Sequence, residues 1–246
     1  MFGLFLLSIL FMSANISAAL SALEPLPDFS NGYELDDPSF IALKSAMVNY
    51  SQESWCSKAK VQMLMDTVII AKPKICVEIG VFAGSTALPI AAALKYLGDG
   101  VLIAIDPWSN AEAIRYLNPE DVNTEWWRSV DMDYAYQQFQ ASLGNWELHS
   151  YCEIFCESSS SAIAKIPEID FLHVDGNYSE EGSLKDVELY LSKVKNGGYV
   201  FISNIFWIVN GFPPRRAALQ HLLDYCVIVG AIEDNNCILL RKVREV

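Results

Sequence analysis

Short apolar runs that favour strands alternate with helix-length segments after residue 74, and this alternation restricts the fold more than any other feature. Ile75–Ile79 and Val101–Ile105 are rich in β-branched residues, and residues 85–97 between them form an apolar stretch that favours a helix. Strands joined through a helix run in the same direction, because the helix returns the chain to the end of the sheet at which the first strand began. The alternation therefore predicts an α/β fold with a mostly parallel sheet.

The same pattern continues to the C-terminus, where it changes. Further strands are expected at 151–155, 169–174, 199–203, 225–229 and 237–241, and helices at 39–50, 58–71, 131–143, 158–165, 180–194 and 213–224. The loop between the last two strands is too short for a crossover helix, so one strand near the end is expected to be antiparallel. Cys226 and Cys237 would lie in this hairpin, and a disulfide between them is left open.

Composition excludes several classes of protein. The chain has 246 residues, 52% of them hydrophobic, which suits one domain with a full core and excludes a disordered or fibrous chain. Its net charge of −13 opposes binding to phosphate backbones, so no nucleic-acid partner is expected. Six cysteines are too few for a disulfide-based scaffold of this length.

The first segment differs from the rest of the chain. Residues 1–22 carry no charged side chain and predict either a cleaved signal peptide or an uncleaved membrane anchor. The protein would then be exported to the periplasm or secreted, or held at a membrane through this segment alone. Residues 23–57 form a lead-in linker and helix, and residues 58–246 form the main domain, with an aromatic-rich insert at 107–136. The oligomeric state is left open.

Polar residues and glycines gather where the first two predicted strands end. Gly80 and Gly84 follow the first strand and allow a tight turn, and Ser85 begins the next helix, whose N-terminus favours an anionic group. Asp106 ends the second strand, where an acidic residue can accept hydrogen bonds from a ribose diol. In a parallel sheet these ends lie side by side, so the pattern predicts a site for a nucleotide or nucleoside.

Two phosphate-binding motifs are missing. The dinucleotide motif G-x-G-x-x-G is interrupted by Phe82, and no G-x-x-x-x-G-K-[ST] sequence occurs. A pyrophosphate ligand is therefore disfavoured relative to a nucleoside with a small charged tail. An NAD-dependent oxidoreductase is kept as an alternative, with these absences against it.

Three stretches, VEIGVFAGSTALPIAAAL, GVLIAIDPW and IDFLHVDGNYSEEGSLKDVELYLSKVKNGGYVFISN, together resemble the class I S-adenosylmethionine-dependent methyltransferases. They are most similar to the small bacterial branch of catechol-type and macrocin-type O-methyltransferases, over roughly residues 58–242. The resemblance implies a Rossmann-like seven-stranded sheet, mostly parallel with one antiparallel strand near the C-terminus. It also implies S-adenosylmethionine as cofactor and O-methylation of a small-molecule or saccharide acceptor.

The resemblance also assigns roles to individual residues. In the cofactor site it implicates Glu78, Gly80, Gly84, Ser85, Asp106, Trp108, Glu157 and Ser158. The glycines and Glu78 would shape the pocket for the methionine part, Asp106 would bind the ribose, and Trp108 would lie against the adenine. Asp175 would face the methyl group, with Tyr178 beside it as the second catalytic candidate.

The sequence departs from the cation-dependent relatives at two places. Those relatives carry a pair of acidic or amide ligands after the fifth strand, where this chain has Ser203 and Asn204. Serine is a poor Mg²⁺ ligand beside a carboxylate, so Mg²⁺ is disfavoured; if it bound, Asp175 and Asn204 would be its ligands. Tyr178 replaces the usual histidine and could act as a base only with a lowered pKa. These changes motivate a second hypothesis, a degenerate member that binds without catalysis.

Three further features have both a structural and a functional interpretation. His173 is expected to be a core histidine rather than part of an acceptor pocket, and Arg215 with Arg216 to be a solvated face rather than an anion site. The aromatic residues of the insert suit both local packing and a cap over the strand ends.

Overall fold

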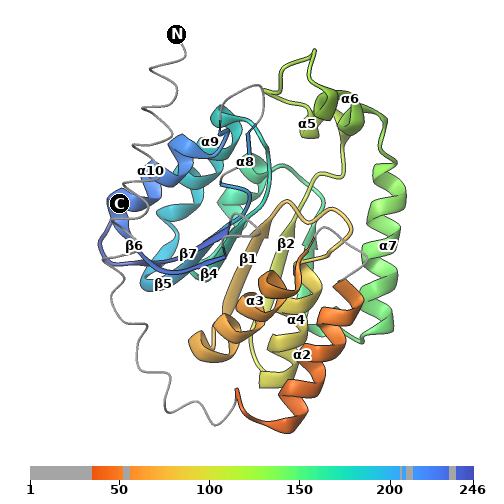
Figure 1. Ribbon diagram of the computed structural model, residues 1–246, viewed down its shortest axis with the longest axis vertical. Helices are drawn as coiled ribbons and strands as arrows, with labels where there is room; N and C mark the ends of the chain where they lie inside the picture. Colours follow the sequence, from red (N-terminus) through yellow and green to blue (C-terminus); the bar gives the residue numbers. More distant parts are fainter. Residues whose placement is uncertain (1–34, 52–55, 206, 209–212, 233–236) are drawn as a thin grey trace.

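The protein is built around one seven-stranded sheet with helices on both faces (Figure 1). The computed structural model describes residues 35–51, 56–205, 207–208, 213–232 and 237–246. The strands are β1 (Ile75–Ile79), β2 (Val101–Ile105), β3 (Cys152–Phe155), β4 (Ile169–Val174), β5 (Val194–Ile202), β6 (Cys226–Ile232) and β7 (Cys237–Lys242). Their order across the sheet is β3-β2-β1-β4-β5-β7-β6.

Strand directions confirm the prediction of a Rossmann-like, mostly parallel sheet. The pairs β1–β2, β1–β4, β2–β3 and β4–β5 are parallel. Strand β7 is antiparallel to both of its neighbours, β5 and β6. From β1 the chain first adds β2 and β3 on one side and then adds β4 and β5 on the other. Ligands bind in folds of this kind at the strand ends where the order switches, between β1 and β4.

Helices connect the strands and cover the sheet. They are α2 (Pro38–Ser51), α3 (Lys58–Ala71), α4 (Ala87–Leu97), α5 (Asn110–Ala113), α6 (Val122–Ser129), α7 (Met132–Asn145), α8 (Ser159–Ala162), α9 (Glu180–Leu191) and α10 (Arg216–Tyr225), with short 3-10 turns η2 (His149–Tyr151) and η3 (Ile163–Lys165). Helices α2, α3, α4 and α7 cover one face, and α8, α9 and α10 cover the other.

Each strand contributes alternate residues to two hydrophobic layers. In β1, Cys76 packs toward α3 and α4, whereas Val77 and Ile79 pack toward α9. All three side chains are buried, which explains why the strand reads as a continuous apolar run rather than as an alternating one. Burial on both faces fixes the position of the strand ends, and with them the residues that follow.

The predicted bounds need correction around the fifth strand. The helix predicted at 180–194 ends at Leu191, and Val194 already begins β5. Residues 196–198, expected to form a turn before the strand, lie within β5, where the register with β4 shifts between Ile169 and Phe171. The glycines are accommodated because the strand is irregular at this point.

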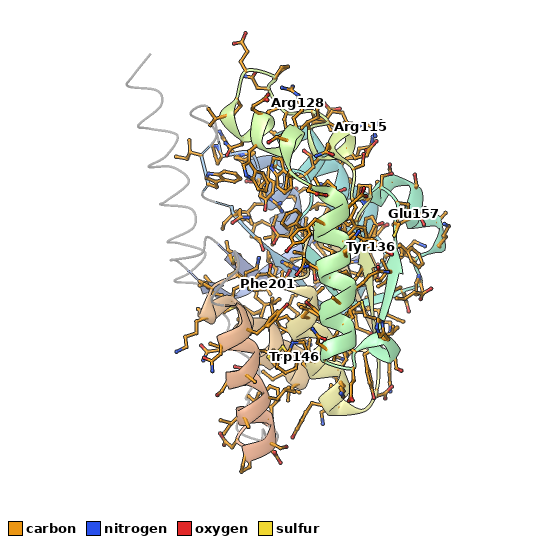
Figure 2. All side chains as sticks on the ribbon, turned by 90° about the vertical axis from the view of Figure 1, so that its right-hand side faces the viewer. Arg115, Arg128, Tyr136, Trp146, Glu157 and Phe201 are labelled. Carbon is orange, nitrogen blue, oxygen red and sulfur yellow. The ribbon has the colours of Figure 1, made fainter. Side chains whose placement is uncertain are left out.

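The insert after β2 is more ordered than its sequence suggests. It contains α5 and α6, which lie above the strand ends in Figure 1. In Figure 2, α7 descends from the insert along the side of the domain, with Tyr136 on its length, Trp146 near its end, and Arg115 and Arg128 on the insert itself.

The terminal hairpin forms as predicted, but its two cysteines do not face each other. Cys226 is opposite Lys242, and Cys237 is opposite Ile232. Residues 1–34, which include the predicted signal or anchor segment, lie outside the described part of the chain. Within the described part, every helix is too short or too polar to cross a bilayer.

Candidate active site

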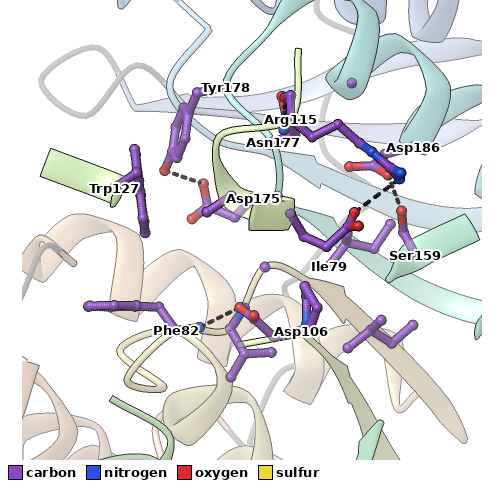
Figure 3. A pocket seen from close by; sticks show the side chains of 18 of the residues that line it. Ile79, Phe82, Asp106, Arg115, Trp127, Ser159, Asp175, Asn177, Tyr178 and Asp186 are labelled. Carbon is purple, nitrogen blue, oxygen red and sulfur yellow. Dashed lines mark hydrogen bonds and ion pairs between the residues drawn. The ribbon is translucent and has the colours of Figure 1, made fainter. Parts of the chain in front are cut away.

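A cavity of about 650 Å³ opens at the C-terminal ends of the parallel strands (Figure 3). The loops after β1, β2 and β4 form its floor, and the insert with α5 and α6 contributes a wall. Its volume falls in the range of small-molecule and cofactor sites. The predicted site residues that line it are Gly80, Ser85, Asp106, Ser158, Asp175, Tyr178 and Asn204.

The other predicted cofactor residues lie around the cavity rather than on its wall. Gly84 packs against Phe139, and Glu78 is fully buried beneath the turn. Trp108 donates its indole N–H to the carbonyl of Phe82 at 2.8 Å, and its ring centroid lies 4.7 Å from that of Tyr136. Glu157 pairs with Lys165 at 2.6 Å.

The turn after β1 holds the two halves of the site together. Gly80 has φ +85°, and a Cβ there would stand 2.5 Å from the carbonyl oxygen of Asp175. Glycine is therefore required both by the backbone conformation and by the close approach of the loop after β4. Gly80 also donates its N–H to the carbonyl of Ile105 at 2.9 Å, so it contacts the chain beside Asp106 as well as the backbone of Asp175.

The carboxylate of Asp106 binds the backbone of its own surroundings. Its Oδ2 accepts hydrogen bonds from the N–H groups of Val81 and Phe82, both at 2.9 Å, and its Oδ1 accepts one from Trp108 at 2.7 Å. Burial raises the pKa of Asp106, and these N–H groups act in the opposite direction without cancelling the effect. A carboxylate accepts about four hydrogen bonds, so a ligand hydroxyl can still bind.

Asp175 is held by cationic side chains instead. The ammonium of Lys60 lies 2.7 Å from its Oδ2, and the guanidinium of Arg215 lies 3.7 Å from its Oδ1. Burial alone would raise the pKa of Asp175, but Lys60 first, and then His173 and Arg215, hold it below the ordinary value. The carboxylate is therefore an anion at neutral pH.

Tyr178 completes this side of the cavity. Its hydroxyl donates to Oδ1 of Asp175 at 3.3 Å and accepts from the amide of Asn204 at 3.0 Å. Burial, followed by the negative charge of Asp175, raises the pKa of Tyr178 well above its usual range. The shift is opposite to the one a general base needs, and it suits a hydrogen-bond donor.

Beneath the cavity, a buried polar chain joins β1, β4 and β5. His173 is fully buried, and its Nε2 lies 2.9 Å from the hydroxyl of Ser203. Its Nδ1 lies 3.4 Å from Oε1 of Glu78, which also accepts a hydrogen bond from Thr86. The second oxygen of Glu78, Oε2, has no hydrogen-bond partner among the described residues. His173 is thus a core residue, as its structural interpretation predicted.

Aromatic rings form the upper wall of the cavity. Trp127 stacks on Tyr178 with ring centroids 6.2 Å apart, and Trp207 meets Tyr178 edge-on with centroids 5.1 Å apart. Phe82 lies 5.7 Å from Trp127, and Trp126 packs against Trp127 at 4.8 Å. The insert is therefore both a packed unit and a cap.

Sequence reasoning missed two of the charged groups. Lys60 is not among the predicted site residues, although it lies one helical turn before Leu64 on the buried face of α3, where a charge needs a partner. Arg215, which the sequence places on a solvated face, is instead fully buried and donates to the carbonyls of Val174 and Gly176 at 2.8 and 3.1 Å. These bonds fix the end of β4, and its guanidinium lies 4.9 Å from the ring of Tyr178.

Comparison with known proteins places the chain in a family. The family described as methyltransferase domain matches residues 77–205, just over half of the chain, while comparison with curated protein sequences gives no match. Solved structures with the same fold include an O-methyltransferase from Bacillus cereus in complex with SAH, with 10% identity, TM-score 0.57, and coverage of 82% of this chain and 91% of that one.

Two other solved structures have the same fold. The O-methyltransferase TomG from Streptomyces achromogenes, in complex with SAM, has 13% identity, TM-score 0.56, and coverage of 82% and 90%. A methyltransferase from Geobacter sulfurreducens has 15% identity, TM-score 0.54, and coverage of 90% and 100%. The chain belongs to the methyltransferase domain family and has the fold of the class I S-adenosylmethionine-dependent methyltransferases.

Proposed function

We propose that this protein transfers a methyl group from S-adenosylmethionine to an oxygen of a small-molecule acceptor, a saccharide included. The observation that carries the proposal is the joining of two chemically different halves in one cavity. The glycine turn, Ser85 and Asp106 form one half, and Asp175, Tyr178 and the aromatic wall form the other. The O-methyltransferases of the same fold are crystallised with SAH or SAM, which supports this cofactor here.

The residues of the first half fit the cofactor. Ser85 lies on the cavity wall just before α4, so its hydroxyl and the helix N-terminus suit a carboxylate. Oε2 of Glu78, which has no hydrogen-bond partner among the described residues, suits a donor such as an ammonium group, and Asp106 retains capacity for a ribose hydroxyl. When bound, S-adenosylmethionine supplies a methyl group on a positively charged sulfur.

The second half suits an acceptor with a flat apolar face. Trp127 stacks on Tyr178 and Trp207 contacts it edge-on, and all three line the cavity. Aromatic side chains bind aromatic rings by stacking and provide a flat apolar surface for ring-shaped acceptors. Their further contribution is to exclude water and to align the acceptor, which accounts for much of the catalysis of a transfer reaction.

Neither alternative from the sequence is favoured. The family match argues against an oxidoreductase, and the cavity retains both halves that a transferase needs, so no observation favours a degenerate binding protein.

The first test is a calorimetric titration of the full chain with S-adenosylhomocysteine. We expect micromolar binding, weakened by about tenfold or more in Asp106→Ala. Asp99→Ala is the matched control, because Asp99 is an exposed acidic residue in the turn that follows the C-terminal end of α4. Ser85→Ala, which leaves the Asp106 hydrogen bonds in place, should also weaken binding. Absence of binding, or binding of NAD in its stead, would overturn the proposal.

A further inference from the structure

The positions that hold a divalent cation in cation-dependent relatives do not form such a site here. Asp175 and Asn204 reach the cavity, but Ser203 is fully buried with its hydroxyl against His173. The Nδ2 of Asn204 lies 3.4 Å from Oδ1 of Asp175, so its amide presents donors rather than an oxygen. Among the residues that the structure describes, no three His, Cys, Asp or Glu side chains are grouped to hold a metal ion. The residues do not fit Mg²⁺.

A positively charged side chain lies beside Asp175, the carboxylate at these metal-binding positions. Lys60 Nζ lies 2.7 Å from Oδ2 of Asp175, with the two side chains only 7% and 13% exposed. Lys60 also lines the cavity. Helix α3 places it there, because Val61, Leu64, Met65 and Val68 bury the same helix in the core and Ser57 caps its first turn through the N–H of Lys60.

We propose that Lys60 is the resident cation of this active site and takes the place of a divalent metal ion. The inference rests on the proposed methyl transfer. Its ammonium, anchored by Asp175, stabilises the negative charge on the acceptor oxygen, and the reaction needs no metal. Tyr178 and Asn204 fix the other oxygen of Asp175, so the ammonium is held at the cavity wall.

The reaction balances without another reactant. The acceptor hydroxyl loses its proton to bulk solvent before it enters the cavity, and the bound oxyanion lies against the Lys60 ammonium. The oxygen forms a bond to the methyl carbon while the carbon–sulfur bond breaks, and sulfur keeps the electron pair. An acceptor with an acidic hydroxyl, such as a phenol, is favoured, because a single ammonium stabilises an oxyanion less than a divalent ion does.

Manganese binding tests the metal side of the proposal. Mn²⁺ is added to the full chain with S-adenosylhomocysteine and followed by electron paramagnetic resonance. We expect no stoichiometric binding in the wild type. Lys60→Glu, which sets a second carboxylate beside Asp175, is expected to create binding, whereas Lys60→Met is not. Stoichiometric Mn²⁺ binding to the wild type that Mg²⁺ displaces would overturn the proposal, whether or not the variants fold.

Ionisation of 4-nitrophenol tests the role of the ammonium, since a merely structural ion pair would not change it. Bound to the wild type with S-adenosylhomocysteine, the probe should ionise about one pH unit lower than in solution, and EDTA should have no effect. Lys60→Met should abolish the shift, and Lys58→Met, an exposed lysine of the same helix, should retain it. No shift in the wild type, or an equal shift in Lys60→Met, would overturn this role. Calorimetry with S-adenosylhomocysteine separately reports whether the proposed function itself fails.

Discussion

Asp106 and Asp175 end the two strands that flank β1, and they face one cavity, yet their charges are balanced by different parts of the molecule. Backbone N–H groups of the adjacent loops surround Asp106, and burial raises its pKa. Lys60 and Arg215 surround Asp175, and its pKa is lowered. A carboxylate bound by amides depends on the local fold of its loop, whereas one bound by cations depends on distant packing.

The residue between the two carboxylates should be the most sensitive to substitution. Gly80→Ala places a Cβ against the backbone of Asp175 in a left-handed conformation. Overpacking and strain together should lower the free energy of unfolding by about 3–4 kcal/mol. Gly98→Ala is the matched control, since Gly98 has φ +70° but a Cβ added there would meet no atom of the described residues within 4 Å. It should cost only about 1 kcal/mol in urea unfolding. Equal losses would show that close packing between the two loops contributes little.

Removal of Lys60 should show how much more the stability of the protein depends on the partner of Asp175 than on the hydrogen bonds of Asp106. Lys60→Met leaves Asp175 without its nearest counter-charge and should cost about 3 kcal/mol of unfolding free energy, because the pair is buried. Asp106→Asn keeps one accepting oxygen among the same amides and should cost about 1–2 kcal/mol. In an Asp175→Asn background the cost of Lys60→Met should shrink markedly. An unchanged cost in that background would mean that Lys60 stabilises the fold by packing alone.

This contrast explains what the sequence could predict. The turn at Gly80 and the acidic end of β2 are local patterns, so Asp106 and its loop are predictable from adjacent residues. Lys60 lies 115 positions from its partner, and no local pattern connects them. The burial of Arg215 is not predictable for the same reason, because its partner Val174 ends β4, 41 positions earlier in the chain. Strand positions were predictable from apolar runs, whereas the irregular start of β5 depends on its pairing with β4.

A third carboxylate, that of Asp186, extends the comparison, because its hydrogen bond comes from a neutral hydroxyl group. Asp186 is buried at the cavity wall and accepts a hydrogen bond from the hydroxyl of Ser159. Burial raises the pKa of Asp186 to about 6 from 3.8, although Ser159 and Arg215 oppose the shift. The folded state thus holds this proton more tightly than the unfolded state, so the contribution to stability is complete below about pH 4 and is lost as the pH rises through 6.

Replacement of this carboxylate should therefore stabilise the protein at neutral pH. Asp186→Asn retains an acceptor for Ser159 and removes the buried charge. Its free energy of unfolding at pH 7 should therefore be about 2–3 kcal/mol higher than that of the wild type. The gain should vanish near pH 4. Asp170→Asn is a useful contrast, because ion pairing with Lys195 lowers the pKa of Asp170 despite burial and the variant should be less stable at pH 7. A gain for Asp186→Asn that persists at pH 4 would assign the effect to packing rather than to charge.

The smallest effect should come from an ion pair of nearly the same length at the surface. Lys165 lies 2.6 Å from Glu157, close to the 2.7 Å of the Lys60–Asp175 pair, but its side chain is 60% exposed. Lys165→Met should change the free energy of unfolding by less than about 0.5 kcal/mol, because water solvates both charges when the pair is broken. Urea unfolding of this variant beside Lys60→Met compares two pairs of matched distance and different burial. If both substitutions cost the same, burial would not be what distinguishes Asp175, and the difference between the two strand ends would lie in geometry alone.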